Sequence, residues 1–374
     1  MDKVDVLVVG AGPCGCAAAL TFLRYARCRV ALIEGGHHEH PRVGETVSAA
    51  LRPLLDFLGA STAIDAAACT MPGYSSRAAW GVDDVLTRDS LFSGRGANQH
   101  LDRRRFDATL AHLVAERGGL LAQGAWLRRI ERCGDKWRVQ VEEQGSERVF
   151  EATQVIDATG RRAAFARRAG AEIRSIDSLV AVVQRWRQPD ARAMERATLV
   201  ESCETGWWYG APLPDGHGVL AFMTDADLLK RLRLTSATAF DAALAQTRSM
   251  RKFVHGRTHA RCPAVTPAGS QVLSCPVGEA WVAAGDAALA IDPLSSLGIG
   301  RAIASGIEAA RIVDERLHGG DELASGYVAD TRAHLDAFLT QRRAIYGDER
   351  RWPDSLFWQR RRDPLSVARM ALAS

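Results

Sequence analysis

Three glycines near the N-terminus have the spacing of a phosphate-binding loop, Gly10-x-Gly12-x-x-Gly15. In this pattern the first glycine permits a tight turn, the second lets the backbone approach a pyrophosphate, and the third lets a helix pack closely on a strand. The phosphates then meet the free N–H groups at the start of that helix. Glu34 follows about 20 residues later, where a carboxylate accepts hydrogen bonds from both ribose hydroxyls. Together these residues predict a dinucleotide site.

The segments around the loop are those that such a site needs. An apolar run at Asp5–Val9 predicts a buried parallel strand, and small residues at Cys16–Arg27 predict the helix that the loop opens. Arg29–Glu34 predicts a second strand that ends on the carboxylate. The three segments form one βαβ unit. A nicotinamide dehydrogenase would have the same unit, so this part of the chain does not distinguish FAD from NAD.

Two motifs at predicted strand ends favour FAD. Asp157-Ala158-Thr159-Gly160-Arg161 closes a strand predicted at Gln154–Ala158. Gly285-Asp286-Ala287-Ala288 closes another strand, predicted at Ala280–Ala284. The carboxylate of Asp286 is placed to accept a hydrogen bond from a ribityl hydroxyl, a group that FAD has and NAD lacks.

A third motif lies further along the chain. Asp292–Gly300, with the sequence DPLSSLGIG, leads into a long helix predicted at Leu297–Leu317. The N–H groups around Gly298 and Ile299 would face any negative charge beside the start of this helix. A reduced flavin anion is a natural occupant of that position.

These motifs resemble the FAD-dependent oxidoreductases of the p-hydroxybenzoate hydroxylase fold, which share the glycine loop, an "ATG" at a strand end and the "GD" motif. The resemblance covers roughly residues 1–320 and implies that Arg103, in Asp102-Arg103-x-x-Phe106-Asp107, contacts FAD. A salt bridge at the start of a helix is the alternative role for this arginine. The residues expected to contact the cofactor are Gly10, Gly12, Pro13, Cys14, Gly15, Glu34, Arg42, Gly44, Arg103, Asp157, Gly160, Gly285, Asp286, Pro293, Gly298 and Ile299.

A narrower resemblance rests on Pro41-Arg42-Val43-Gly44-Glu45-Thr46, which is similar to the "P-R-x-G-E" segment beside the flavin in the tryptophan-halogenase-like branch. That branch also contains maturation flavoproteins that hydroxylate a protein tryptophan on the way to tryptophylquinone, namely the lysine-oxidase, glycine-oxidase and amine-dehydrogenase maturases. Halogenases use a lysine after this segment, but the chain has no lysine between Lys3 and Lys136. Trp207–Pro212 (WWYGAP) resembles the "GWWY" segment of the maturation branch.

The resemblance implies a single-component monooxygenase. NAD(P)H would dock transiently and reduce the flavin, and a flavin C4a-hydroperoxide would hydroxylate an electron-rich aromatic, which includes a tryptophan or indole in a protein or peptide. A free aromatic small molecule is the other substrate class. The alternatives are a flavin-dependent halogenase, an FAD-dependent dehydrogenase or oxidase, and a non-catalytic flavin-binding partner in maturation. The sequence does not indicate which ring position is hydroxylated or whether NADH or NADPH is the reductant.

The candidates for the catalytic site come from two segments. Trp207, Trp208 and Tyr209 are expected to form the pocket wall over the flavin, with an ordinary core role as the alternative. Glu45 is expected to orient the flavin loop or to accept a proton, with a salt bridge to Arg42 as the alternative. The histidines at positions 37, 38 and 40 are expected in an exposed loop.

The fold class that follows is α/β (α+β), with a Rossmann-type FAD-binding domain, a mainly antiparallel β-sheet substrate domain and C-terminal helices. The two domains are expected to be interleaved. Residues 1–75, 98–175 and 270–320 form the FAD-binding domain, residues 76–97 and 176–269 the substrate domain, and residues 321–374 the helical segment. A hairpin is expected from Trp137–Glu142 and Val149–Ala152.

Composition bears on the location of the protein and on its partners. The 374 residues are 47% hydrophobic with a net charge of +4, and no run approaches the ~18 apolar residues of a membrane span. With no leader-like start, the chain is expected to be cytoplasmic. Eight scattered cysteines have no metal-ligand spacing, and no nucleic-acid module is recognisable. The arginine-rich stretch Arg350–Arg362, with aromatics interleaved, would either dock a partner or cap the core. The oligomeric state is not indicated.

Overall fold

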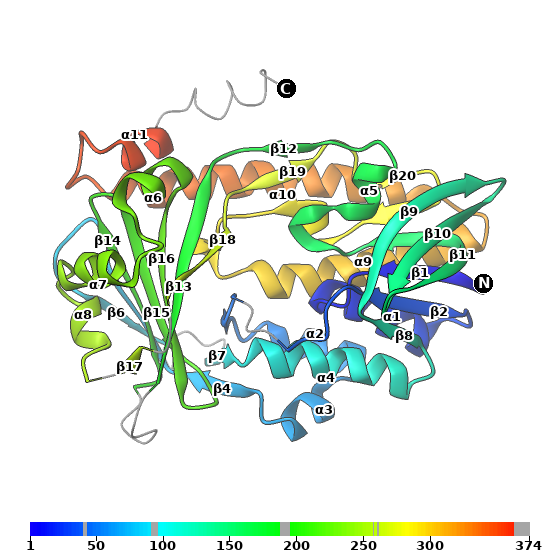
Figure 1. Cartoon of the computed structure of the whole chain (residues 1–374), viewed down its shortest axis with the longest axis horizontal. Helices are drawn as coiled ribbons and strands as arrows, with labels where there is room; N and C mark the ends of the chain where they lie inside the picture. The colour runs from blue at the N-terminus through cyan, green and yellow to red at the C-terminus, as the bar shows by residue number, and fades with distance from the viewer. Residues whose placement is uncertain (40–42, 91–95, 188–194, 257, 260–261, 363–374) are drawn as a thin grey trace.

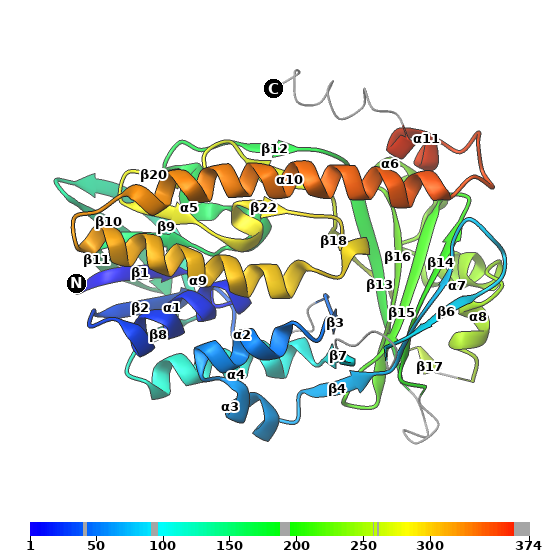
Figure 2. The same ribbon diagram turned by 180° about the vertical axis from the view of Figure 1, so that it is seen from behind.

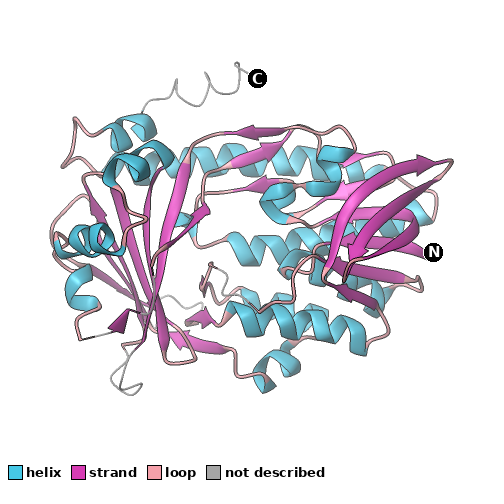
Figure 3. Cartoon of the chain, viewed as in Figure 1, coloured by secondary structure: helices cyan, strands magenta, loops and turns pink. Residues whose placement is uncertain are grey.

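A computed structural model of the chain describes residues 1–39, 43–90, 96–187, 195–256, 258–259 and 262–362. Two large β-sheets lie toward opposite ends of the long axis of the molecule, with helices between and around them (Figures 1 and 3). A long helix, α10 (Glu322–Asp348), runs from one sheet toward the other, as Figure 2 shows. Among the described residues, no helix has the length and apolar character for a bilayer crossing.

The first sheet contains the predicted βαβ unit. Its central strands are parallel, in the order β21, β11, β1, β2, β8, and its remaining strands are antiparallel to their neighbours. The strands are β1 (Asp2–Val9), β2 (Val30–Glu34), β8 (Leu120–Gln123), β9 (Ala125–Cys133), β10 (Lys136–Glu143), β11 (Ser146–Asp157), β20 (Val277–Gly278) and β21 (Trp281–Ala283).

Both faces of this sheet are covered, which explains why its central strands are continuous apolar runs. Val6 and Val8 of β1 pack into one hydrophobic cluster, while Leu7 and Val9 pack into another on the opposite face. Helices cover the first face and the β9–β10 hairpin with α5 the second. The helices are α1 (Pro13–Tyr25), α2 (Leu51–Leu58), α3 (Ser61–Ala66), α4 (Arg103–Glu116), α5 (Ala164–Arg168) and α9 (Gly298–Leu317).

The hairpin expected from Trp137–Glu142 and Val149–Ala152 is present, but its second arm does not end there. Ser146–Asp157 is one continuous strand, β11. Its first half pairs with β10, and from Phe150 onward it also pairs with β1. The hairpin arm and the strand expected at Gln154–Ala158 are therefore one element, because β11 runs without a break from its pairing with β10 into its pairing with β1.

The second sheet is mainly antiparallel, in the order β17, β13, β16, β15, β14, β5, β6, with β18 paired to β13. Only the β14–β5 pair is parallel among these described strands. The strands are β5 (Ser75–Ala79), β6 (Leu86–Asp89), β13 (Leu179–Arg187), β14 (Ala197–Cys203), β15 (Gly206–Pro212), β16 (His217–Asp225), β17 (Thr258–His259) and β18 (Ala264–Pro267).

The two faces of the second sheet have different neighbours. Trp208 and Phe222 face a core closed by Phe240 and Met250 from the short helices. The opposite face packs in part against the C-terminal helices. The helices concerned are α6 (Ala226–Leu232), α7 (Ala237–Ala245), α8 (Met250–Phe253), α10 (Glu322–Asp348) and α11 (Leu356–Arg362).

Two small sheets join the larger parts of the fold. One has the order β3, β7, β4 and the other the order β12, β19, β22. Their strands are β3 (Thr46–Val47), β4 (Thr70–Gly73), β7 (Asn98–Leu101), β12 (Ile173–Ser175), β19 (Gln271–Leu273) and β22 (Leu289–Ala290). The chain passes between the two large sheets more than once. The predicted α/β (α+β) fold class is confirmed.

The arginine-rich C-terminal stretch caps the core. Phe357 and Trp358 are fully buried and pack against Tyr346 of α10. Arg361 is buried as well and forms an ion pair with Asp225 at the end of β16, with 2.7 Å between Nη2 and Oδ1. Of the two roles considered for this stretch, the described residues therefore support the packing role.

Candidate functional site

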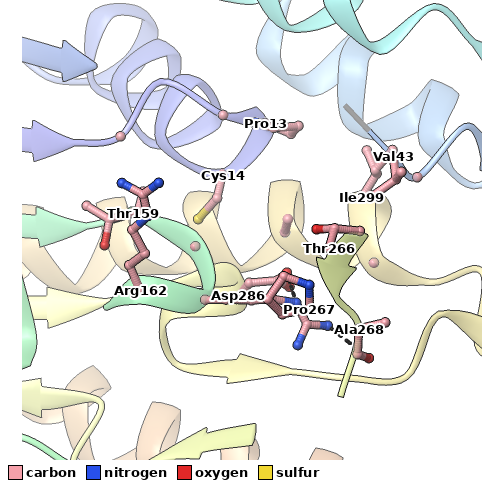
Figure 4. A pocket seen from close by; sticks show the side chains of 18 of the residues that line it. Pro13, Cys14, Val43, Thr159, Arg162, Thr266, Pro267, Ala268, Asp286 and Ile299 are labelled. Atoms are coloured by element: carbon pink, nitrogen blue, oxygen red, sulfur yellow. Dashed lines mark hydrogen bonds and ion pairs between the residues drawn. The ribbon is translucent and has the colours of Figure 1, made fainter. Parts of the chain in front are cut away.

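A cavity of about 1700 Å³ is lined by residues from both large sheets. The start of α1, the end of β2 and the start of α9 form one part of its wall, and β13, β15, β16 and β18 form another. Figure 4 shows Pro13 and Cys14 on one side of this space, and Thr266 and Pro267 of β18 with the following Ala268 on another. The volume exceeds the ~300–1,000 Å³ typical of small-molecule pockets, so the cavity has room for a large ligand together with a second one.

The glycine loop has the geometry that its pattern predicts. Gly10 has φ +105°, and a Cβ there would lie 2.3 Å from the carbonyl oxygen of Ala158. Gly12, Pro13 and Cys14 line the cavity, and no side chain caps the first turn of α1. The N–H groups of that turn are therefore available to an anion. Gly15 is absent from the lining, and its role is to let α1 pack on the loop, since a Cβ there would lie 1.8 Å from the Gly10 oxygen.

Glu34 reaches the same part of the cavity from the end of β2. Its Oε2 accepts a hydrogen bond from the Ala11 N–H at 2.8 Å, and its Oε1 accepts one from the Gly36 N–H at 3.1 Å. These bonds fix the carboxylate beside the loop. The expectation of an exposed histidine loop is wrong for His38, which is buried with Nε2 2.9 Å from the Ala11 oxygen. The position of His40 lies outside the described residues.

Trp126, which sequence reasoning missed, lines the cavity next to Gly35. A Cβ on Gly35 would lie 2.7 Å from the indole ring, and the guanidinium of Arg162 lies 5.7 Å from the ring centroid. The side chain is 46% exposed, although tryptophan is highly buried on average. Its place beside Glu34, where the ribose of a dinucleotide is expected, suits an adenine ring.

We expect Trp126→Ala to weaken FAD binding roughly 5- to 150-fold, because stacking of a base on an aromatic ring is worth ~1–3 kcal/mol. Titration of the FAD-free protein with FAD, followed by flavin fluorescence, measures this. Tyr74→Ala is the matched control, since Tyr74 is similarly exposed but does not line the cavity. Equal affinities of the two variants would contradict the assignment.

Arg103 forms the salt bridge that was the alternative role for it, and it also faces the cavity. Its guanidinium pairs with Asp107, with 2.9 Å between Nη2 and Oδ2, and donates from Nη1 to the Val43 oxygen at 2.6 Å. Arg103 also lines the cavity. Gly44 has φ +102°, and a Cβ there would lie 2.8 Å from Arg103 Nη1, so only glycine fits against this arginine. Arg42 lies outside the described residues.

Glu45 lines the cavity and is buried. Its Oε2 accepts a hydrogen bond from the Gly44 N–H at 2.9 Å. Burial raises the pKa of the carboxyl above its ordinary value, and the Gly44 hydrogen bond and the nearby positive charge of Arg103 oppose this rise only in part. A proton is therefore held on Glu45 more tightly than in the unfolded chain.

The raised pKa of Glu45 predicts a pH-dependent effect of Glu45→Gln. Because the folded state binds the proton more tightly, the contribution of Glu45 to stability is full below the ordinary pKa of glutamate and is lost as the pH rises toward the raised value. Glutamine does not titrate, so its advantage over glutamate in unfolding free energy should be larger at pH 8 than at pH 5. Urea unfolding at both pH values measures it. A difference independent of pH would show that Glu45 titrates normally.

The strand-end motifs divide into lining and supporting residues. Gly160 and Asp286 line the cavity, and Asp286 lies 3.9 Å from Arg161 Nε. Asp157 does not reach it. Its Oδ1 accepts from the N–H and hydroxyl of Thr159, and its Oδ2 accepts from the N–H groups of Phe165 and Ala166. The carboxylate that was expected to bind the cofactor is thus engaged in holding the turn and the start of α5.

Gly285 also supports the site from behind. It is buried, its N–H donates to Ser305 Oγ at 2.9 Å, and a Cβ there would lie 3.0 Å from Cys14. It therefore sets the distance between the "GD" turn and the start of α1. Pro293, Gly298 and Ile299 line the cavity, and α9 begins at Gly298 without a capping side chain. Its first-turn N–H groups are open to an anion.

The aromatic segment places its residues on alternate faces of β15. Trp207 and Tyr209 line the cavity, whereas Trp208 is buried in the core on the opposite face, 4.7 Å from the Phe222 ring. Neighbouring residues of a strand point to opposite faces, so the three could not share one wall. The structure therefore does not bring Trp208 to the cavity.

Hydrogen bonds fix both aromatic side chains that line the cavity. Trp207 Nε1 donates to the Tyr346 hydroxyl at 3.0 Å, and that hydroxyl donates to Asp292 Oδ2 at 2.7 Å. The Tyr209 hydroxyl lies 2.7 Å from Thr46 Oγ1. Tyr346 lies on α10 and was not recognised from the sequence, because only the fold brings it beside Trp207.

This arrangement fits a flavin dinucleotide. Uncapped helix starts of α1 and α9 supply N–H donors at two places along the wall, and Glu34 supplies a carboxylate near the first. An apolar wall formed by Ala221, Met223 and Trp207 continues from there. Within the described ranges, no group of three or more His, Cys, Asp or Glu residues is arranged to hold a metal ion. The cavity thus pairs a dinucleotide site with an aromatic-walled chamber.

This chain is similar to several known flavoproteins. Residues 5–209 match the family model described as FAD dependent oxidoreductase. The chain is 34% identical over 365 residues to a Marinomonas mediterranea protein named putative FAD-dependent oxidoreductase LodB, covering 96% of this chain and 97% of the relative. It is 25% identical to a tryptophan 2-halogenase of Chondromyces crocatus, over 90% of this chain and 66% of that protein.

A solved structure gives a similar result. The peptidyl tryptophan dihydroxylase QhpG, described as essential for tryptophylquinone cofactor biogenesis, superposes with a TM-score of 0.72. The match is 23% identical and covers 97% of this chain and 79% of that one. These comparisons confirm the likeness to halogenase-like flavoproteins and their tryptophan-modifying relatives. The chain belongs to the FAD-dependent oxidoreductases, and FAD is its cofactor.

Proposed function

We propose that this protein is a monooxygenase that hydroxylates an electron-rich aromatic ring, with a tryptophan side chain in a protein or peptide as the favoured substrate class and NAD(P)H as a transiently bound reductant. One observation carries the proposal. The cavity that begins at the dinucleotide loop continues to a chamber whose wall includes Trp207 and Tyr209. An aromatic substrate in that chamber would lie beside the flavin end of the cofactor.

The residues of the chain have defined tasks in this proposal. Amides at the start of α1 bind the pyrophosphate, and Glu34 binds a ribose. Amides at Gly298 and Ile299 stabilise negative charge on the flavin ring. When bound, FAD supplies the activation of O₂ and the delivery of one oxygen atom to the substrate. The apolar wall of the chamber would keep water away from the flavin, and this limits unproductive side reactions of the activated oxygen.

The composition of the wall supports hydroxylation over halogenation. The chain has only four lysines, Lys3, Lys136, Lys230 and Lys252, and none of them lines the cavity. Arginine cannot take the place of the halogenase lysine, because its guanidinium stays protonated and does not form the same adduct. The peptidyl tryptophan substrate named for the structural neighbour supports the choice of substrate class.

The test uses the FAD-loaded protein with NADH or NADPH, ¹⁸O₂ and peptides that contain tryptophan. Each peptide is paired with a copy in which leucine replaces the tryptophan. We expect ¹⁸O in the tryptophan peptide alone, detected by mass spectrometry. A halogenated product that depends on added chloride or bromide would favour the halogenase instead. Reduction of the flavin by substrate without NAD(P)H would favour a dehydrogenase, and no O₂ consumption would overturn the proposal.

A further inference from the structure

Three polar side chains form a chain of hydrogen bonds that ends at the wall of the chamber. His100 of β7 lies directly opposite Thr46 of β3, with 3.0 Å between His100 Nδ1 and Thr46 Oγ1. Thr46 Oγ1 in turn lies 2.7 Å from the hydroxyl of Tyr209 on β15. Thr46 and Tyr209 line the cavity, while His100 lies behind them. One series of hydrogen bonds thus joins residues from elements that are far apart in the sequence.

The state of His100 follows from its surroundings. The side chain is 1% exposed, and burial lowers its pKa to about 4, so the ring is neutral near pH 7 and carries one N–H. Its Nε2 is buried and has no hydrogen-bond partner among the described residues. A Cβ on Gly73 would lie 2.5 Å from this nitrogen, so backbone packs against it.

This environment selects one tautomer. Nε2 has no partner among the described residues in either tautomer, but a proton there would bury an N–H without an acceptor, and orphaned buried N–H groups are rarer than under-satisfied acceptors. A proton on Nδ1 is paired instead, because it donates to Thr46 Oγ1. His100 therefore carries its proton on Nδ1.

The direction of the next bond follows. Once Thr46 Oγ1 accepts from His100, the Thr46 hydroxyl still has a proton to donate, and the Tyr209 oxygen is the only other hydrogen-bond partner that the described residues offer it. Tyr209 thus accepts from Thr46, and its own proton points away from Thr46. Burial and the adjacent Glu45 raise the pKa of Tyr209, so its hydroxyl keeps that proton.

We propose that His100 and Thr46 are positioning residues that make the Tyr209 hydroxyl a fixed hydrogen-bond donor into the chamber, where it binds an oxygen atom of the substrate. The inference rests on the proposed function, since it assigns the chamber to an aromatic substrate. An unmodified indole has an N–H donor but no oxygen acceptor. The substrate oxygen is therefore a carbonyl or hydroxyl next to the ring, such as the backbone carbonyl of a peptidyl tryptophan.

The triad orients a donor and does not conduct protons away from the chamber. His100 is its far end, and Nε2 of this residue has neither exposure nor a further partner within the described part of the chain. The consequence is that the donor should act at the level of binding, before any reduction of the flavin.

The first test compares two probes, indole and oxindole, which carries a carbonyl at C2. Binding to the FAD-loaded protein is followed by the absorbance of the flavin, without NAD(P)H. We expect oxindole to bind about 3- to 10-fold more tightly than indole, the worth of one neutral hydrogen bond. The ratio should fall to near 1 in Tyr209→Phe. It should also fall in Thr46→Val and be restored in Thr46→Ser, which keeps the hydroxyl.

If the ratio of oxindole to indole affinity were unchanged in Tyr209→Phe, the Tyr209 hydroxyl would not be the donor. If the ratio were unchanged in Thr46→Val, Thr46 would not be a positioning residue. Because no oxygenation is measured, these outcomes are separate from failure of the proposed hydroxylation.

A second test needs no substitution. ¹⁵N-histidine NMR should show one neutral histidine with its proton on Nδ1 and no titration between about pH 5.5 and 8. A proton on Nε2 of His100 would reverse the bond direction and overturn the inference.

Discussion

Gly15→Ala is expected to yield a protein that binds FAD roughly 100-fold more weakly, and that is colourless when purified. A Cβ at this position would lie 1.8 Å from the Gly10 oxygen and 3.2 Å from the Ala158 Cβ, so α1 must move away from the loop. The closest contact is with a backbone atom, which can move less than a side chain can. We therefore take the upper end of the ~1–3 kcal/mol cost of overpacking, which corresponds to roughly a 100-fold loss of affinity. Titration with FAD after mild removal of bound cofactor measures the change.

Gly326→Ala is the matched control for this substitution. Gly326 lies within α10, and a Cβ there meets nothing within 4 Å. Alanine in a helix is favoured over glycine by about 1 kcal/mol, so this variant should keep its FAD and gain slightly in stability. If Gly15→Ala bound FAD as tightly as Gly326→Ala, the close approach of α1 to the loop would not be needed for the cofactor.

The second large effect concerns the C-terminal cap. Asp225→Asn should lower the free energy of unfolding by about 3–5 kcal/mol, because it leaves the buried guanidinium of Arg361 without a countercharge. Both side chains of this ion pair are 2% exposed, and Asp225 also accepts from Arg360 at 2.9 Å. Urea unfolding, followed by tryptophan fluorescence, measures the loss.

An exposed ion pair provides the comparison. Arg248 and Asp83 lie 3.0 Å apart and are more than 60% exposed, so Arg248→Met should cost no more than about 1 kcal/mol. The double variant Asp225→Leu, Arg361→Met should recover much of the loss, since it removes both buried charges. A loss in Asp225→Asn no larger than that in Arg248→Met would mean that Arg361 is solvated.

The C-terminal cap also explains how the chamber wall is held. Tyr346 of α10 contacts the Arg361 guanidinium, accepts from Trp207 and donates to Asp292. Trp207 belongs to the second sheet, and Asp292 begins the turn before α9. One hydroxyl therefore connects the aromatic wall with the segment that leads to the cofactor, and the helix that spans the molecule in Figure 2 fixes their separation.

Local chemistry made the cofactor end of the site predictable. The glycine loop, Glu34 and the start of α9 act through backbone amides and one carboxylate, whose positions follow from a strand, a turn and a helix in succession. The same local reasoning placed β1, α1 and β2 within a few residues of their bounds. It was less successful for Asp157 and Gly285, because a motif residue that binds a ligand and one that supports the turn have the same sequence pattern.

The sequence by itself determined the fold class, the cofactor and the family, since these depend on short segments that fold in the same way wherever they occur. Only the tertiary structure decided that Tyr209 and not Trp208 lines the chamber, that Trp126 lies beside Glu34, and that Tyr346 and His100 stand behind the wall. These residues meet across the molecule, and their contacts depend on strand register and helix packing. Such long-range placement leaves no periodic signal in the chain, because it is set by the sum of many weak contacts.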